Sequence, residues 1–308
     1  MWAIAAYRRY RSLLIHKSDD PDFPEHKANH RQYLSDKSRF KEVVPIQDEK
    51  VRARIHGTFR LQYLKDVVLA RILDDPTFSV LNSLIYFYQM DILGHIASNP
   101  AIVKQIFTVI TSPEQSQQKK KDAVLFIQQC TSIAKNANAN ARAQLYHSFV
   151  TSGLFSIIAF ALQNQDAAVR VAGVDIFLTI IDHDAIMMRN LVFKAISEKT
   201  KPMTETLVDL FLVEPDLGVK AQVADAIKIL LEPMNQQNAM ERAAATGDNS
   251  FVAKLRSPAM QQQNDQHLTA FFEGPAAKKL FEPLENLASR QNCKFRLRAE
   301  SMSVLTLK

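Results

Sequence analysis

The chain of 308 residues is poor in cysteine and glycine and has no long apolar run. Its 2 Cys are too few for a disulfide framework, and Cys130 falls on the apolar face of a predicted helix. We therefore expect a buried, reduced thiol, as in a nuclear or cytoplasmic protein. With only 7 Gly, the composition favours an all-α protein. No apolar run approaches the ~20 residues that cross a bilayer, so we expect no membrane partner.

The net charge of +6 is concentrated near the N-terminus. Residues 1–71 hold 15 of the 38 Lys and Arg but 9 of the 32 Asp and Glu, and the rest of the chain is balanced. Because acids are mixed with the basic residues, we expect no nucleic-acid partner. The start MWAIAAYRRYRSLL has its charges after an apolar stretch, the reverse of a secretory signal. An amphipathic helix is favoured there over a mitochondrial presequence.

A helical pattern recurs with a period of fifty residues. Asp166–Asp182 reads DAAVRVAGVDIFLTIID, Asp216–Glu232 reads DLGVKAQVADAIKILLE, and a weaker copy starts at Ser116. Ser116, Asp166 and Asp216 occupy one position, where a short polar side chain can accept from a free first-turn N–H. We therefore predict that each residue is the N-cap of a helix.

Each copy carries an apolar stripe at helical spacing, which predicts a buried face. The stripes are Val169, Ala172, Gly173, Ile176, Phe177, Ile180 and Ile181, then Val219, Gln222, Val223, Ala226, Ile227, Leu230 and Leu231. A second helix is expected before each, at Leu154–Leu162 and Thr206–Val213. Helix pairs of this kind stack into an α-solenoid. The long period predicts an irregular armadillo/HEAT-like array, with Ile176 and Phe177 buried between repeats.

Two apolar segments lie closer to the N-terminus. From Leu61 to Leu73, apolar residues occupy most of a helical circumference, which predicts a helix covered from several sides. Lys65, Asp66 and Arg71 interrupt it, and we expect them to form ion pairs at the rim of the core. The aromatic stretch Leu84–Tyr88 is interpreted as core rather than as a ligand site.

Several segments in this region resemble the SMEK family, the regulatory subunit 3 of protein phosphatase 4. The matching segments occur in the family's order: DPDFP (Asp20–Pro24), HRQYL (His30–Leu34), FKEVVPI (Phe40–Ile46), YLKDVVLAR (Tyr63–Arg71) and LNSLI (Leu81–Ile85). The resemblance implies an armadillo-like domain over residues 20–235. Residues 1–19 match nothing expected, and the N-terminal EVH1/PH-like domain of the family is absent. The chain also ends within the helical region, so we expect a fragment or a truncated product.

Beyond the armadillo-like domain, residues 236–266 are rich in Gln, Asn, Ala and Ser, which predicts a loop or insertion. Helical patterning resumes in residues 267–308, at Leu268–Phe272, Ala276–Ala288 and Phe295–Leu307. We interpret these as further helices of the same array.

No motif for catalysis or cofactor binding is found, and we expect neither an enzyme nor a cofactor. His26 and His30 lie near acidic residues, but the spacing is typical of a helix start rather than of a metal site. The resemblance implies a non-catalytic scaffold that binds the phosphatase 4 catalytic subunit and a second regulatory subunit and directs them to phosphoprotein substrates, in the nucleus and cytoplasm. The alternatives are an armadillo-type adaptor or transport protein and, third, a helical hydrolase.

The candidate partner-binding residues are basic. They lie where the resemblance is densest, and they are Arg52, Arg54, Arg60, Lys65 and Arg71. Because maintaining the fold does not require so many exposed cations, we expect this surface to dock an acidic face of a protein partner.

Overall fold

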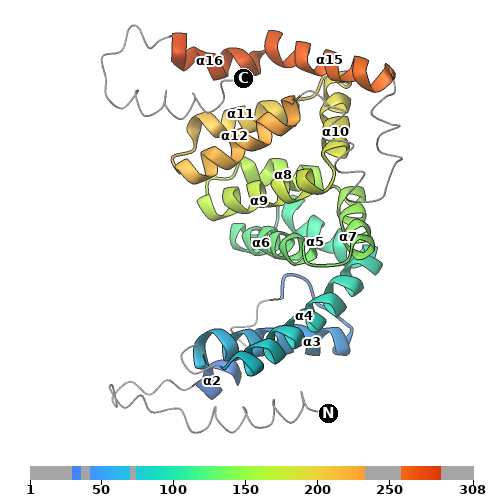
Figure 1. The fold of residues 1–308 in the computed structure, drawn as a ribbon, viewed down its shortest axis with the longest axis vertical. Helices are drawn as coiled ribbons and strands as arrows, with labels where there is room; N and C mark the ends of the chain where they lie inside the picture. Colours follow the sequence, from blue (N-terminus) through green and yellow to red (C-terminus); the bar gives the residue numbers. More distant parts are fainter. Residues whose placement is uncertain (1–29, 36–41, 70–73, 233–257, 286–308) are drawn as a thin grey trace. The chain divides into compact units, whose positions relative to one another are not determined.

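The computed structural model describes residues 30–35, 42–69, 74–232 and 258–285, and in these ranges every regular element is a helix (Figure 1). This confirms the prediction of an all-α, helical-repeat fold. The chain forms two compact units. Unit 1 comprises the described residues of Met1–Phe126 and Ile133–Gly153, and unit 2 those of Ile127–Ser132 and Leu154–Lys308.

Unit 1 contains a π-helical turn and six helices, and one of these, α6, is shared with unit 2. They are α2 (His30–Ser35), α3 (Glu49–Tyr63), η2 (Leu64–Val68), α4 (Asp75–Ser98), α5 (Pro100–Thr111), α6 (Gln117–Ala134) and α7 (Ala139–Thr151). Helix α3 packs along α4. The core between them is formed by Leu61, Leu64, Leu69, Leu81 and Ile85.

The segment Leu61–Leu73 is not the continuous helix that the sequence predicts. Helix α3 ends at Tyr63, and in the π turn η2 the N–H of Leu69 donates to the carbonyl of Leu64 at 2.9 Å. This wider turn places Leu64 and Leu69, five residues apart, on the buried side, whereas Val67 is 52% exposed. The segment is therefore covered on fewer sides than its composition suggests. Residues 70–73 lie outside the described residues.

The remaining helices of unit 1 begin with the polar caps expected of short connections. The carboxylate of Asp74 accepts from the N–H of Thr77 at 2.9 Å, and Asn99 caps α5 in the same way. The predicted cap Ser116 accepts from the N–H of Lys119 at 3.3 Å. Helices α5 and α7 meet through Phe107 and Phe149, whose ring centroids are 5.8 Å apart.

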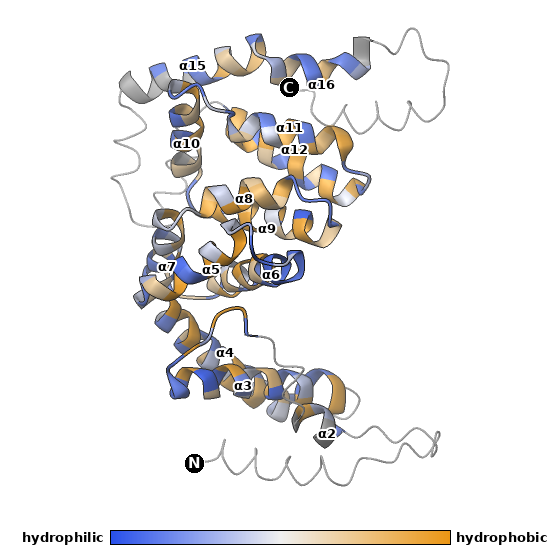
Figure 2. Cartoon of the chain, turned by 180° about the vertical axis from the view of Figure 1, so that it is seen from behind, coloured by the Kyte–Doolittle hydropathy of each residue, from blue (hydrophilic) through white to orange (hydrophobic). Residues whose placement is uncertain are grey.

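Unit 2 contains seven complete helices. They are α8 (Leu154–Leu162), α9 (Ala167–His183), α10 (Ala185–Ser197), α11 (Met203–Val213), α12 (Leu217–Leu231), α15 (Pro258–Glu273) and α16 (Pro275–Glu285). Helices α8 and α9 are largely apolar (Figure 2) and pack against each other, as do α11 and α12. The side chain of Gln128, from the α6 segment in this unit, donates to Asp175 of α9 at 2.6 Å.

The predicted repeat is confirmed in unit 2. Asp166 accepts from the N–H of Ala168 at 2.9 Å, and Asp216 accepts from Val219 at 3.0 Å. Every member of the α9 stripe is buried, with Ile176 and Phe177 at 0% exposure. On α12 one member is wrong, because Gln222 is exposed. The buried arc of α12 lies instead toward Lys220 and Ala224, which the stripe omitted.

The structure adds a helix that the repeat pattern did not predict. Helix α10 follows α9 and precedes α11 along the chain. The carboxylate of Asp184 caps α10 by accepting from the N–H of Met187 at 2.9 Å. One period of the sequence therefore holds three helices, α9, α10 and α11. This third helix accounts for a period longer than a helix pair requires.

The last helices also begin earlier than expected. Helix α15 starts at Pro258, so the loop predicted for residues 236–266 is wrong for its last part, and residues 236–257 lie outside the described residues. The start of α15 has few apolar residues, and the helix is stabilised instead by packing on α10. Helix α16 occupies most of the predicted segment Ala276–Ala288, and Phe295–Leu307 is not described.

Among the described residues, no single helix is long and apolar enough to cross a membrane. Helices α7 and α8 together, bent by 75° at the break between them, have the length and composition of a membrane-spanning segment. The apolar residues of α8 are, however, mostly buried in the protein. The described residues contain no group of three or more His, Cys, Asp and Glu that could hold a metal ion. Cys130 is buried as predicted, and burial raises the pKa of its thiol to about 12.

Candidate partner-binding surface

Four of the five basic residues proposed as a docking surface are described, and three of these contact their own unit. Arg54, on α3, lies over the Tyr88 ring of α4 at 4.6 Å from its centroid, and its Nε is 3.4 Å from a carboxylate oxygen of Asp91. A cation over an aromatic face, with an ion pair beside it, stabilises the packing of α3 on α4. Arg54 is thus partly a structural residue.

Lys65 links η2 to α4 in a similar way. Its ammonium donates to the amide oxygen of Asn82 at 3.3 Å and lies 3.2 Å from a carboxylate oxygen of Asp66. It also lies 5.6 Å from the ring centroid of Phe78. This confirms the expected ion pair for Lys65 and Asp66, with a side chain that is only 21% exposed. Arg71, the third residue of that prediction, lies outside the described residues.

Arg52 and Arg60 complete the described basic set. The Nε of Arg52 is 3.2 Å from a carboxylate oxygen of Glu42. Arg60 is exposed in the last turn of α3. The pKa of His56 is lowered mainly because the His56 ring is partly buried, and secondly by the positive charge of Arg60. Arg60 is therefore the member of the set with the weakest structural role in the described contacts.

A different surface of unit 1 is unusually apolar. On α4, Val80 is 39% exposed, Tyr86 40% and Phe87 60%, although the sequence predicted Leu84–Tyr88 as core. The rings of Tyr86 and Phe87 meet edge to face, with centroids 6.0 Å apart. Only Ile85 of that stretch is buried, and Leu84 and Tyr88 are half-buried against α3. The core prediction is therefore wrong for the two outer aromatics.

These side chains share one side of α4. Positions three, four and seven apart lie on the same helical face, which collects the residues that we call the aromatic face: Val80, Ser83, Tyr86, Phe87 and Met90. None of the five is charged. Leu81 and Ile85 point to the opposite side, into the core with α3. From Val80 to Met90, one side of α4 is thus buried in the core with α3, and the aromatic face lies on the other side.

The chemistry of the aromatic face is that of a protein-binding surface. Exposed apolar clusters mark interaction sites more often than scattered apolar residues do. Tyr, Phe and Met are enriched at interfaces, whereas charged residues are depleted from interface centres. Sequence reasoning missed the face because the helical period of α4 is apolar on both sides, and periodicity alone does not say which side is covered.

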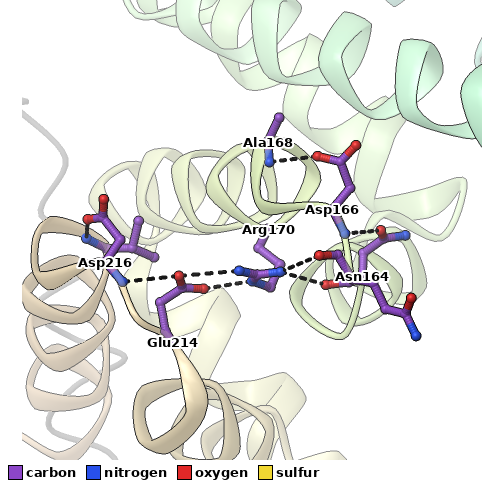
Figure 3. A network of polar contacts seen from close by, with 8 residues as sticks. Asn164, Asp166, Ala168, Arg170, Glu214 and Asp216 are labelled. Atoms are coloured by element: carbon purple, nitrogen blue, oxygen red, sulfur yellow. Dashed lines mark hydrogen bonds and ion pairs between the residues drawn. The ribbon is translucent and has the colours of Figure 1, made fainter.

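A polar cluster around Arg170 in unit 2 is structural. Arg170 of α9 donates through Nε to Glu214 at 2.6 Å, and through Nη1 to the carbonyls of Asn164 at 3.1 Å and Gln165 at 2.7 Å (Figure 3). The N–H of Asp216 donates to the same carboxylate at 3.3 Å. Hydrogen bonding from Arg170 is the main cause that lowers the pKa of Glu214. The cluster fixes two interhelical turns and leaves Glu214 only 3% exposed.

Of the two histidines considered as metal ligands, His30 is hydrogen-bonded within the fold. The Nδ1 of His30 lies 2.9 Å from the hydroxyl of Tyr63, joining α2 to α3. His26 lies outside the described residues. The contact of His30 supports its interpretation as part of a helix start.

Comparison with known proteins gives a consistent result. A family model described as phosphatase 4 regulatory subunit 3 matches residues 19–307. An uncharacterised protein of Schizosaccharomyces pombe is 39% identical over 222 residues, which is 69% of this chain and 27% of that protein. Suppressor of Mek1 from Dictyostelium discoideum is 36% identical over 214 residues, 69% of this chain and 20% of that protein.

A third relative is the serine/threonine-protein phosphatase 4 regulatory subunit 3 of Drosophila melanogaster. It is 29% identical over 226 residues, which is 70% of this chain and 23% of that protein. The chain thus spans about a quarter of the length of these relatives. No solved structure is significantly similar to it.

Proposed function

Because this chain belongs to the family of phosphatase 4 regulatory subunit 3, we propose that it is a non-catalytic scaffold that binds the phosphatase 4 catalytic subunit. The single observation that carries the proposal is the family match, which covers almost the whole chain. The family consists of regulatory rather than catalytic subunits, in agreement with the expectation that the chain is not an enzyme. No comparison supports the alternative of an unrelated adaptor or transport protein.

We further propose the other partners and the location of this scaffold. A second regulatory subunit would bind the same scaffold, and the assembly would be directed to phosphoprotein substrates in the nucleus and cytoplasm. Stacked helices offer extended, semi-rigid surfaces that suit such a scaffold. Dephosphorylation itself would be performed by the catalytic partner.

We propose the aromatic face of α4 as the main contact for the catalytic subunit. Tyr86 and Phe87 offer large apolar area with few rotatable bonds, which is typical of the residues that dominate binding energy. The basic residues would contribute through long-range attraction, which raises the association rate and weakens with salt. Of these, Arg60 is the cleanest candidate, because Arg54 and Lys65 also hold α3 and η2 on α4.

The experiment compares capture of the purified catalytic subunit by matched variants of the full chain. Tyr86→Ser/Phe87→Ser should weaken capture by at least ~30-fold, the usual effect of losing a central aromatic contact. Val213→Ser/Leu217→Ser is the control, because these residues of unit 2 are 75% and 66% exposed. Circular dichroism should show that both variants keep their helicity. Equal capture by the two variants and the wild type would contradict the assignment of α4.

The basic residues need a separate pair of variants. Arg60→Glu should slow association at low salt and leave stability unchanged, since exposed charges act mainly on the encounter rate. Arg54→Glu should also destabilise unit 1, because it faces the ring of Tyr88 and pairs with Asp91. An association rate for Arg60→Glu that equals the wild-type rate at all salt concentrations would remove Arg60 from the surface.

A further inference from the structure

Unit 2 ends, within its described part, in two helices, α15 and α16, that pack on α10 and α11, with a buried histidine among their contacts. His267 of α15 is 1% exposed, and its ring meets the Phe193 ring of α10 edge to face at 5.5 Å between centroids. Phe271, one turn further along α15, is buried as well. Helix α16 packs on α11. Three apolar residues of α16 are buried: Ala276, Ala277 and Leu280.

A buried positive charge acts on the imidazole. Arg189 of α10 is 6% exposed, and its Nη2 donates to the carbonyls of Ile229 at 2.6 Å and Glu232 at 2.7 Å. These bonds satisfy carbonyls at the C-terminal end of α12. They hold the guanidinium at the end of α12.

Neither ring nitrogen of His267 makes a well-formed hydrogen bond to a protein group. Burial is the main cause that lowers its pKa to about 4, followed by the charge of Arg189, while the backbone of Leu230 acts weakly in the opposite direction. Lys279 of α16 is paired with Glu205 and Asp209 of α11, and Lys220 of α12 lies over the Phe211 ring of α11. The other charged residues on α10, α12, α15 and α16 whose side chains are described are exposed to solvent, as is Glu232 at the end of α12: Lys194, Asp225, Lys228, Asp265, Glu273, Lys278 and Glu282. Solvent screens them, so Arg189 is the charge that matters at the ring.

We infer that His267 is a protonation-sensitive latch: its neutral ring holds α15 and α16 on α10 and α11, and adding a proton releases these helices. A buried, charged imidazole would face repulsion from the charge of Arg189 and loss of hydration, which detachment of α15 would relieve. Detachment would uncover apolar surface on α10 and α11. The latch concerns unit 2 alone and does not depend on the proposed phosphatase partner.

The direction of the pH effect follows from the two proton affinities. In the detached state the ring is in water, with an ordinary pKa of 6.5, whereas in the attached state the pKa is about 4. Between these values the detached state binds the proton more readily, so lowering the pH favours detachment. The contribution of His267 to attachment is therefore full above the upper value, weakens as the pH falls between the two values, and changes no further below the lower one.

Hydrogen exchange of the full chain tests the latch. After correction for the intrinsic pH dependence of exchange, the amides of α15 and α16 should open more often at lower pH, by up to ~tenfold for each pH unit between the two pKa values. The amides of α8 and α9 serve as the internal reference. His267→Phe keeps an aromatic ring against Phe193 and should abolish the effect.

Two further variants keep the test decisive. His267→Gln, which cannot be protonated, should also remove the pH dependence if the Phe variant folds poorly. His147→Phe changes an exposed histidine of α7 and should leave the wild-type profile unchanged. Opening of α15 and α16 that does not increase on acidification, or that increases equally in the His267 variants, would overturn the inference.

Discussion

Helices α9 and α4 share an apolar composition and a similar start, but they differ in how neighbouring helices surround them. Both are rich in apolar residues and begin after an aspartate that caps the first turn. Helix α9 is packed by α8, α10 and α12, and its whole apolar stripe is buried. Helix α4 buries Leu81 and Ile85 against α3 but exposes Tyr86 and Phe87 on the other side. Helix α4 also contacts α5 and α7, yet these two side chains stay exposed. An apolar pattern thus identifies a helix that can be buried, and where its neighbours lie around and along it decides how much of it is.

The largest expected contrast between these helices comes from removing one phenylalanine ring in each. Phe177→Ala in α9 removes a side chain at 0% exposure and should cost about 3–5 kcal/mol, through lost transfer energy and a residual cavity. Phe87→Ala in α4 removes a ring that is 60% exposed and should change stability by less than about 0.5 kcal/mol. Urea unfolding of both variants measures the difference.

Tyr86→Ala is a useful companion, because its ring contacts that of Phe87. It should also be nearly neutral if the aromatic face is solvated. A cost above about 2 kcal/mol for either α4 variant would mean that the face is covered in solution. It would then be core, as the sequence predicted, rather than a docking surface.

The next contrast concerns arginines that join two helices. Arg170→Ala leaves the carboxylate of Glu214, 3% exposed, without its ion partner and should cost about 3 kcal/mol. Arg54→Ala breaks a pair whose side chains are 45% and 56% exposed and should cost less than about 1 kcal/mol. Denaturant unfolding of the two variants checks the ratio.

A double variant shows whether the buried charge causes the Arg170 effect. Arg170→Ala/Glu214→Gln removes both charges, so it should be more stable than Arg170→Ala alone. The wild-type pair also predicts acid sensitivity: because the pKa of Glu214 is lowered below 4.5, its contribution is present above that pH and is lost as pH falls through the lowered value. If the double variant is less stable than the single one, the cost comes from the lost bonds to Asn164 and Gln165.

The accuracy of the sequence-based predictions differs between the two units for a physical reason. In unit 2, the caps Asp166 and Asp216 and the stripe around Phe177 could be predicted, because they depend on local spacing and on a core that closes around α9. Helix α10 was missed because it breaks the pattern of helix pairs, although Asp184 is a recognisable cap. The long period was the signal that could have indicated it.

In unit 1, the errors arose where tertiary packing decides. The π turn that exposes Val67 is a change of backbone register, which the pattern of residue types does not encode. The basic residues were correctly identified as numerous, but Arg54 and Lys65 contact α4, a role that depends on which helix lies beside them. Whether the remaining basic surface docks a partner stays a prediction.

The smallest contrast uses the glycines of the same two helices. A Cβ at Gly173 of α9 would lie 2.7 Å from the Cβ of Ala161 and 3.3 Å from the backbone nitrogen of Leu162, where α8 and α9 approach closely. Gly173→Ala should therefore cost about 1–3 kcal/mol by overpacking. At Gly94 of α4 nothing lies within 4 Å of the added atom, so Gly94→Ala should stabilise the helix by about 0.5–1 kcal/mol through reduced backbone entropy in the unfolded chain. Both changes can be read from urea midpoints, and a destabilising Gly94→Ala would show that this side of α4 is closely packed.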